Sequence, residues 1–178
     1  MILKPVFFFR GRGVVSTLIR WQTWGEWSHV GVGFCSFYMV EAWQGKGVRS
    51  KPAPKASEDD VAILHATMSA DQSFQMDKFL SEQTGKRYDY RGVLRFISRS
   101  KVRSNDRWFC SELVVSAFQA VGINLLARIE SGKVSPQLLW HSPLLEKQEQ
   151  ERDCNHLRDA TEKVDETRCP VEKQIVKP

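Results

Sequence analysis

One cysteine of this sequence lies in a setting that favours nucleophilic chemistry. Cys110 follows Asn105 and Asp106, which are good N-cap residues, so the sequence predicts that the cysteine lies in the first turn of a helix. Exposed backbone N–H groups and the helix dipole stabilise a thiolate there and lower the thiol pKa. Val114 and Ala117 share its helical face, which predicts that the thiol lies between the helix and a sheet. Taken alone, such a buried cysteine is more often a small core residue than a catalytic one.

A histidine in an alternating strand is the candidate base. Over Ser28–Phe34, two valines and a phenylalanine form one apolar face, whereas His29, Gly31 and Gly33 form the other. The two glycines remove side chains beside the histidine, and this pattern predicts space for a close approach of the cysteine helix. On its own, His29 also fits a hydrogen-bonded structural histidine.

Glu41, on the following strand Phe37–Trp43, is the candidate acid. A two-residue loop would place Glu41 and His29 on opposite faces of the hairpin, whereas a three-residue loop over 34–36 would set them directly opposite each other. We predict this odd register, or a bulge equivalent to it. Glu41 would then orient the imidazole and stabilise its protonated form, as the acid of a catalytic triad does. Alone it also fits an exposed carboxylate on a strand, but the three residues together favour catalysis.

The elements that must position these residues follow an α+β pattern, with an antiparallel sheet and helices packed against it. The predicted strands are Val6–Phe9, Ser28–Phe34, Phe37–Trp43 and Val61–Ala66. The predicted helices are Val14–Trp21, a helix from a Ser69 cap to about Thr84, one at about Tyr90–Ser98, and one from near Trp108 to Gly122. In the Ser69 helix, Gln72 occupies the capping-box position and Gly85 follows the end.

The composition changes near Leu145. Residues 1–144 carry periodic apolar residues and form the predicted catalytic domain, whereas residues 145–178 form a polar tail predicted to be mobile or partly helical. The net charge is +5, and the basic excess lies in residues 1–144, which favours anionic partners. No apolar run reaches the roughly 20 residues of a membrane span, and the apolar N-terminus is a poor signal peptide. The expected location is therefore cytoplasmic, where thiols stay reduced.

Three segments carry a resemblance to a known family: Ser28-His29-Val30-Gly31, the strand with Val40-Glu41-Ala42, and Trp108-Phe109-Cys110-Ser111-Glu112-Leu113. They resemble the circularly permuted papain-like hydrolases, which are relatives of the NlpC-type cell-wall peptidases and of the lecithin:retinol acyltransferase group. The order of histidine, acid and cysteine along the chain is that of the permuted branch. The similarity extends over most of residues 5–143.

The resemblance implies a papain-like fold, with the nucleophile at a helix N-terminus, and an amidase, peptidase or acyl-transfer activity through a thioester. It implies Cys110, His29 and Glu41 as the triad and Tyr88 as an aromatic residue that lines the site. The backbone N–H of Cys110 can donate to the developing oxyanion. The sequence does not identify a second donor, and we take Tyr88, Trp108 and Trp27 as candidate substrate or oxyanion contacts.

A cluster of tryptophans precedes the histidine. Trp21, Trp24 and Trp27 could wall an apolar cleft, rest on a membrane interface, or cover an edge of the core.

A stripe of basic residues is predicted between Tyr88 and Cys110. Arg91, Arg95 and Arg99 recur every four residues and could bind a phosphate, an anionic lipid or nucleic acid, or form a solvated helix face. No nucleic-acid motif accompanies the stripe, so a specific nucleic-acid partner is not expected.

The sequence leaves three functions to distinguish. The first is a cysteine amidase, peptidase or related acyl hydrolase that acts on a small amide or peptide. The second is a lipid-directed acyltransferase or phospholipase with the same triad, and the third is a catalytically silent module that binds an anionic ligand. The four cysteines show no zinc-finger or disulfide-framework spacing, and no nucleotide-binding glycine loop is present, so we expect no metal or cofactor.

Overall fold

The computed structural model describes residues 1–35, 37–54, 60–89 and 107–147. At its centre is an antiparallel sheet of five strands in the order β4-β3-β2-β1-β5. The strands are β1 (Ile2–Phe9), β2 (His29–Phe34), β3 (Tyr38–Trp43), β4 (Gly47–Pro52) and β5 (Val61–Met68). The predicted α+β class, with an antiparallel sheet and packed helices, is confirmed.

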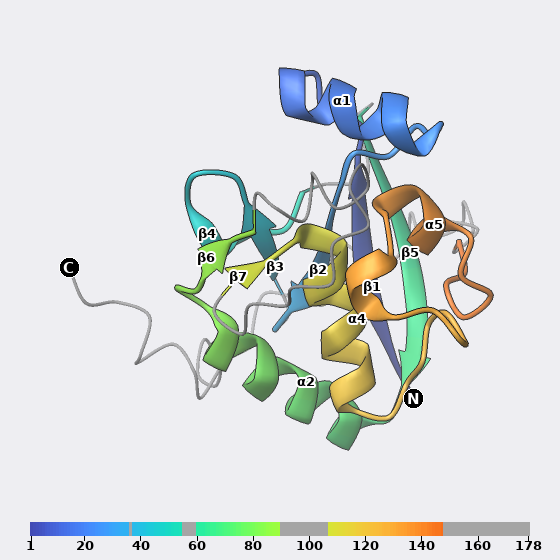
Figure 1. Cartoon of the computed structure of the whole chain (residues 1–178). Helices are drawn as coiled ribbons and strands as arrows, with labels where there is room; N and C mark the ends of the chain where they lie inside the picture. The colour runs from blue at the N-terminus through green and yellow to red at the C-terminus, as the bar shows by residue number, and fades with distance from the viewer. Residues whose placement is uncertain (36, 55–59, 90–106, 148–178) are drawn as a thin grey trace, which may run out of the picture.

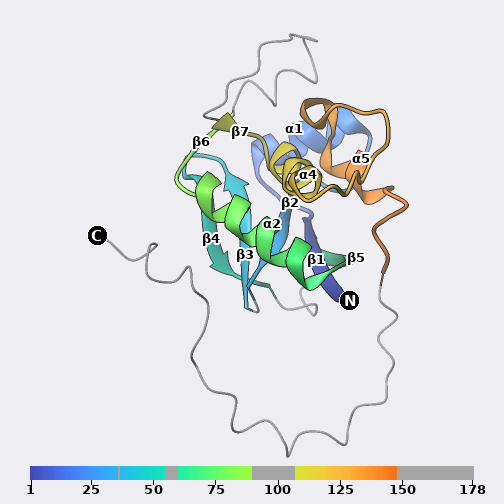
Figure 2. The ribbon, with the colours of Figure 1, turned by 90° about the horizontal axis from the view of Figure 1, so that it is seen from below.

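Helices cover one face and one end of this sheet. They are α1 (Val14–Thr23), α2 (Ala70–Gln83), α4 (Cys110–Ala120) and α5 (Pro136–Trp140), with a 3₁₀ turn at Ser131–Lys133. In Figures 1 and 2, α2 and α4 pack beside each other on the sheet, and α1 lies at the end where β1 finishes. A short parallel pair, β6 (Arg87–Tyr88) and β7 (Arg107–Trp108), leads into α4.

The hydrophobic core lies between the sheet and α4. Val6 and Phe8 of β1 alternate toward this side together with Val30 and Val32 of β2, and all four are fully buried. Leu113 of α4 belongs to the same buried cluster. Burying such a side chain contributes about 1.5–3 kcal/mol, so α4 is held firmly against β2.

Helix α2 has the ends that the sequence predicts. The Ser69 hydroxyl accepts a hydrogen bond from the Gln72 backbone N–H at 3.1 Å, and the Gln72 side chain accepts one from the Ser69 N–H at 3.0 Å. This is the predicted capping box. Gly85 follows the helix with a φ of +88°, a conformation that favours glycine.

Cys110 lies in the first turn of α4, as predicted, but the helix starts slightly later than the predicted start near Trp108. The helix begins at Cys110 itself, after an N-cap at Phe109 that has no side-chain cap. Asn105 and Asp106, the predicted cap, lie outside the described residues. The Ser111 hydroxyl hydrogen-bonds to the Val134 carbonyl oxygen and anchors this first turn.

Several short elements are absent from the sequence prediction, β4 and α5 among them, and two predictions are not tested. Strand β4 is a polar edge strand without apolar alternation, and α5 is a short helix capped by Ser135, so neither gives a strong periodic signal. The helix at about 90–98 and the stripe of Arg91, Arg95 and Arg99 lie outside the described residues.

The packed body continues past the predicted boundary at residue 144. Leu145 is buried in the core, and Glu146 forms an antiparallel bridge with His65 of β5. The rest of the predicted tail, from residue 148, lies outside the described residues. Within the described ranges, no helix combines the length and the hydropathy that crossing a membrane requires.

Candidate active site

The β2–β3 hairpin places His29 and Glu41 on the same face of the sheet. Its pairs are Val32↔Val40, Gly33↔Met39 and Phe34↔Tyr38, so the loop covers 35–37 and not the predicted 34–36. The loop still has three residues, so His29 and Glu41 stay on the same face, as predicted. The register is shifted, however, so that Glu41 lies beside Gly31 and the Trp43 ring packs against His29. The shared face is confirmed, and the predicted direct pairing of His29 with Glu41 is wrong.

The pairing of β2 with β3 stops before the end that carries these two residues. β2 stays paired with β1 as far as His29↔Phe9, and β3 stays paired with β4 as far as Trp43↔Gly47. The pairs between β2 and β3, in contrast, end at Val32↔Val40. Helix α4 packs against both strands. The start of α4 therefore meets the sheet where two neighbouring strands are not hydrogen-bonded to each other.

The Cys110 sulfur lies against this open end of β2. The side chain is 1% exposed, and the backbone N–H groups of Val30, Ser111 and Cys110 itself interact with the sulfur. Val30 directly follows His29 in β2, so the thiol contacts the backbone of the residue next to the one that carries the imidazole. Among the described cysteines Cys110 is a free thiol, whereas Cys35 is disulfide-bonded, which differs from the expectation of reduced thiols.

The pKa of the Cys110 thiol is shifted in the direction opposite to the prediction. Burial raises it to about 12, although hydrogen bonds from the backbone N–H groups of Val30, Ser111 and Cys110 act to lower it. The negative charge of Glu41 raises it further. The helix start does supply amides, as predicted, but removal from water outweighs them. At neutral pH the resting group is therefore a protonated thiol.

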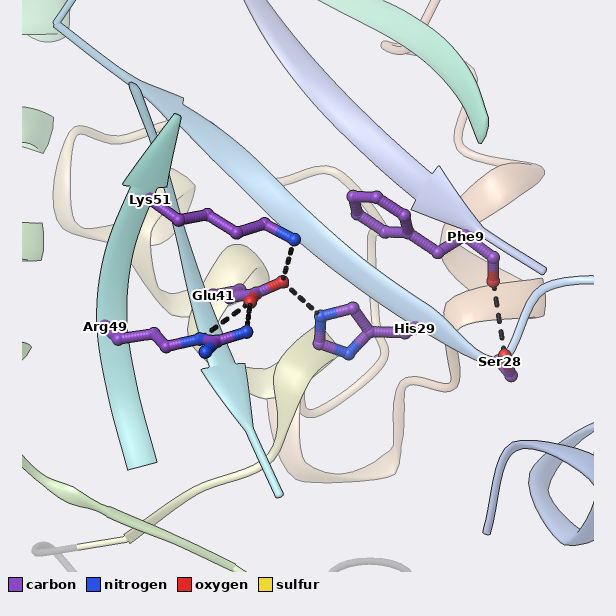
Figure 3. A network of polar contacts seen from close by, with 6 residues as sticks. All are labelled: Phe9, Ser28, His29, Glu41, Arg49 and Lys51. Atoms are coloured by element: carbon purple, nitrogen blue, oxygen red, sulfur yellow. Dashed lines mark hydrogen bonds and ion pairs between the residues drawn. The ribbon is translucent and has the colours of Figure 1, made fainter. Parts of the chain in front are cut away.

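His29 and Glu41 form a buried pair (Figure 3). The Nε2 atom of His29 lies 2.9 Å from Oε2 of Glu41, and the Glu41 side chain is fully buried. An ionised carboxylate can only accept hydrogen bonds, so Nε2 carries the proton that is shared with Glu41. In the neutral imidazole this leaves Nδ1 as the atom that can accept a proton. The pair thus fixes the tautomer that a general base requires.

Two cations complete the surroundings of Glu41. Arg49 donates to Oε1 from Nε at 3.0 Å and from Nη2 at 2.7 Å, and the Lys51 ammonium lies 3.3 Å from Oε2. Burial alone would raise the pKa of Glu41, but hydrogen bonds and charges from His29, Arg49 and Lys51 lower it to about 2. Glu41 is therefore ionised at every physiological pH.

Aromatic rings hold the imidazole from two sides. The Phe9 ring centroid lies 5.5 Å from that of His29, and Trp43 meets the imidazole edge-on at 5.0 Å. Together with the Glu41 hydrogen bond, these contacts fix the position of the ring.

The resting structure does not join the histidine to the cysteine. Both residues are described, and no hydrogen bond links the Cys110 sulfur to the His29 ring. The strand alternation explains this, because Val30 points into the core beside α4 and His29 points to the other face. The structure thus brings His29 and Glu41 together and places Cys110 at the adjacent backbone.

The two glycines of β2 have a different role from the predicted one. A Cβ atom at Gly31 would meet the Met39 side chain, and one at Gly33 would lie 2.6 Å from Pro5. The glycines therefore make room for side chains of the neighbouring strands, not for α4.

The three candidate contact residues lie in two places. Tyr88 and Trp27 are buried in the core, and Trp108 lies in β7, shortly before α4. Tyr88 is buried, with its ring 6.2 Å from that of Phe109, the residue before the cysteine. Trp108 is half-buried against Phe79, and its indole Nε1 has no hydrogen-bond partner among the described residues. The Trp108 indole N–H is therefore a buried donor without a partner.

Trp27 is a core residue and not a wall of the site. Its ring packs against Trp140 at 4.8 Å and against Phe8 at 6.0 Å, and it is 8% exposed. Trp21 and Trp24, in contrast, are 71% and 93% exposed. The tryptophan cluster thus combines a core-covering role with an exposed surface on α1.

Sequence reasoning missed Arg49 and Lys51. Both belong to β4, which has no apolar alternation, and a polar segment of this kind is typical of a loop. The available signal was the spacing of the two cations, since alternate residues of a strand share one face and an arginine pairs well with a glutamate across a hairpin.

Comparisons with known proteins support a distant relationship. No family model matches the chain. The chain is 27% identical to the "probable lipoprotein peptidase YaeF" of Escherichia coli strain K12 over 175 aligned residues, which cover 78% of this chain and 63% of that protein. The chain thus spans slightly less than two thirds of the length of this curated relative.

The fold is also found in a solved structure. The "metalloprotein yiiX" of Escherichia coli O157:H7 superposes with a TM-score of 0.63 at 21% identity, covering 80% of this chain and 93% of that one. At this identity the similarity shows the fold alone. Within the described residues of our chain, no group of three or more His, Cys, Asp or Glu side chains is placed to hold a metal ion.

Proposed function

We propose that this protein is a cysteine hydrolase of the amidase or peptidase type, with a circularly permuted papain-like fold. Cys110 is the nucleophile, His29 the general base and Glu41 the acid that orients it. The observation that carries the proposal is the buried His29–Glu41 pair at the strand end where the Val30 amide contacts the Cys110 sulfur. The distant similarity to a probable peptidase supports the same reaction class.

The chemistry follows from the protonation states. Nδ1 of His29 takes the proton from the Cys110 sulfur as the sulfur attacks the carbonyl carbon of an amide or ester. A thiol with a pKa of about 12 is not ionised in advance, so proton transfer accompanies the attack. The protonated imidazole is stabilised by Glu41, whose ionised state is secured by its own cationic partners.

The remaining steps release the two halves of the substrate. The oxyanion of the tetrahedral intermediate accepts a hydrogen bond from the backbone N–H of Cys110, with the Trp108 indole N–H as a candidate second donor. His29 returns its proton to the leaving amine or alcohol, and the acyl group stays on sulfur as a thioester. Water, deprotonated by His29, then hydrolyses the thioester and restores the thiol.

Catalysis in this scheme requires a local movement. The imidazole and the sulfur must come into contact, and the carbonyl must reach a sulfur that is almost fully buried at rest. Strands β2 and β3 are not paired with each other at this end, so the movement would break no ladder hydrogen bond between them.

A second candidate function is a binding module without catalysis. The high pKa of the thiol and the absence of a His29–Cys110 hydrogen bond are the observations that favour it. In that case the charged network at Glu41 would bind an anionic ligand, and Cys110 would be a core residue.

A lipid-directed acyltransferase or phospholipase with the same triad is a neighbouring reaction. The exposed Trp21 and Trp24 on and after α1 favour it, because tryptophan side chains prefer membrane interfaces.

A substrate panel tests these functions. Acyl amides, short peptides, acyl esters and phospholipid vesicles are each incubated with the wild-type protein and with Cys110→Ser. The proposal predicts amide or ester hydrolysis that Cys110→Ser abolishes, and fatty-acid release from vesicles would favour the lipid-directed reaction. Turnover that Cys110→Ser leaves unchanged, or no turnover of any substrate, would contradict the proposal.

A further inference from the structure

The charged network around Glu41 holds more positive charge than the carboxylate needs. Arg49 and Lys51 both contact a single ionised side chain, so two cations face one anion. Neither cation forms another ion pair within the described residues. One cation would suffice to neutralise a buried carboxylate, and the second leaves a surplus charge beside His29.

The two cations are the outermost members of the network (Figure 3). The side chains of Arg49 and Lys51 are 28% and 31% exposed, whereas those of Glu41 and His29 are 0% and 11% exposed. Both cations come from β4, which is an edge strand of the sheet. A solute that approaches His29 from this side therefore meets Arg49 and Lys51 first.

Both cations keep hydrogen-bond donors for a ligand. The contacts to Glu41 use two of the five N–H groups of the Arg49 guanidinium, from Nε and Nη2. The Lys51 ammonium has three N–H groups, and its described ion pair is the one with Glu41 at 3.3 Å. A carboxylate is the group that best matches such a pair, because it accepts several charge-assisted hydrogen bonds at once.

Aromatic rings keep the two cations in place. The Lys51 ammonium lies 4.9 Å from the Phe9 ring centroid and 5.7 Å from that of Trp43, and the Arg49 guanidinium lies 5.0 Å from the Trp43 ring. The same two rings flank the imidazole of His29. The cations and the candidate base thus share one aromatic frame, which fixes their separation.

We propose that Arg49 and Lys51 form an anion-binding subsite beside His29 that recognises a carboxylate of the substrate. If the proposed hydrolase function holds, on which this reading of the subsite rests, the preferred substrates are acyl amides or peptides with a carboxylate close to the scissile bond. Arg49 and Lys51 are then specificity residues, in addition to their role in holding Glu41.

Binding of a matched pair of probes tests the subsite without any reaction. N-acetylglycine carries the carboxylate, and N-acetylglycinamide is its neutral counterpart. Ligand-observed NMR titrations with the full chain are expected to show binding of the acid that is about tenfold stronger than that of the amide, since charge-assisted hydrogen bonds contribute on this scale. Equal affinity for the two probes would overturn the subsite.

Three variants locate the effect. Lys51→Met should remove most of the preference for the acid while Arg49 still holds Glu41, and Lys51→Arg should keep it. Lys46→Met removes an exposed lysine from the turn between β3 and β4 and is the matched control. A preference that survives in Lys51→Met, or that Lys46→Met reduces as much, would contradict the assignment.

Inorganic phosphate separates a carboxylate subsite from a general anion site. We expect inorganic phosphate to bind the subsite more weakly than N-acetylglycine does, and so to displace little of the acid at equal concentration. Phosphate that binds as tightly as N-acetylglycine, or more tightly, would overturn the carboxylate assignment. The result is independent of catalysis. If the protein prefers the carboxylate probe but turns over no substrate, the proposed hydrolase function fails and the subsite stands. If it turns over substrates without this preference, the subsite fails and the hydrolase function stands.

Discussion

The first turn of α4 and the charged network of β2–β4 bury ionisable groups in opposite ways. Cys110 is surrounded by backbone amides and apolar side chains, and burial raises the pKa of its thiol to about 12. Glu41 is equally buried, yet His29, Arg49 and Lys51 lower its pKa to about 2. Burial therefore does not decide the charge state by itself. A buried group keeps its charge only where charged partners accompany it.

The two regions therefore have different roles in the proposed mechanism. In this mechanism, the network supplies a permanent charge and a fixed imidazole before a substrate binds. The proposed nucleophile in α4 stays neutral and buried until His29 reaches it. Variants that change one region at a time test this difference.

The largest effect is expected from removal of the sulfur. Cys110→Ala should reduce acyl hydrolysis by at least about 10³-fold, because loss of a covalent nucleophile removes the whole pathway. The thermal unfolding midpoint should change little, since alanine is a similar small residue. The kinetic control is Ser116→Ala, in the same helix, and equal losses in both variants would point to damage of the fold.

Neutralising the acid should have the next largest effect. Glu41→Gln keeps the shape but leaves Arg49 and Lys51 facing an uncharged amide, so His29 is no longer oriented by a carboxylate. We expect a loss of about 10²-fold in kcat/KM. Glu82→Gln changes an exposed glutamate on α2 and should leave the rate unchanged. A rate for Glu41→Gln that equals that of the wild type would exclude the triad.

The lowered pKa of Glu41 makes stability depend on pH. The carboxylate is ionised in the folded protein down to about pH 2, whereas in the unfolded chain it takes up a proton near its ordinary pKa of 4.5. Its contribution, about 3 kcal/mol, is present above pH 4.5 and is lost as the pH falls toward 2. Urea unfolding between pH 6 and pH 3 should show about 2 kcal/mol of this loss in the wild type and none of it in Glu41→Gln. Identical pH profiles would refute the shift.

The smallest effect links the two regions. The charge of Glu41 raises the pKa of the Cys110 thiol, so Glu41→Gln should increase the thiolate fraction. We expect iodoacetamide to alkylate native wild-type Cys110 slowly at pH 7.5 and the Glu41→Gln variant a few times faster. Mass spectrometry of the peptide that contains residue 110 measures both rates, with the denatured protein as the reference. A slower reaction in Glu41→Gln would contradict the coupling.

The sequence allowed part of the site to be predicted. An odd hairpin loop was enough to place His29 and Glu41 on one face, because parity depends only on loop length. The register was wrong because Phe37, an apolar residue, looks like part of a strand but lies 80% exposed in the turn. Cys35 adopts a positive φ of 49° in this turn, and no residue pattern in the sequence predicts that conformation.

The electrostatics of the site were harder to predict. A helix start suggests a low thiol pKa, but the outcome at Cys110 depends on burial, which only the packed structure reveals. Likewise, the spacing of the two cations of β4 was a weak signal, and their role became clear only from the hairpin that brings Arg49 opposite Glu41. Local propensity located the chemical groups, and tertiary packing set their charge states.

The most direct test is the detection of an acyl-enzyme. Intact-protein mass spectrometry, followed by peptide mapping, is performed after brief mixing with an activated acyl ester. We expect one acyl group on Cys110, formed by the wild type and by the His141→Ala control but not by His29→Ala. Acylation that is absent from Cys110, or that proceeds equally without His29, would contradict the proposed nucleophile and base.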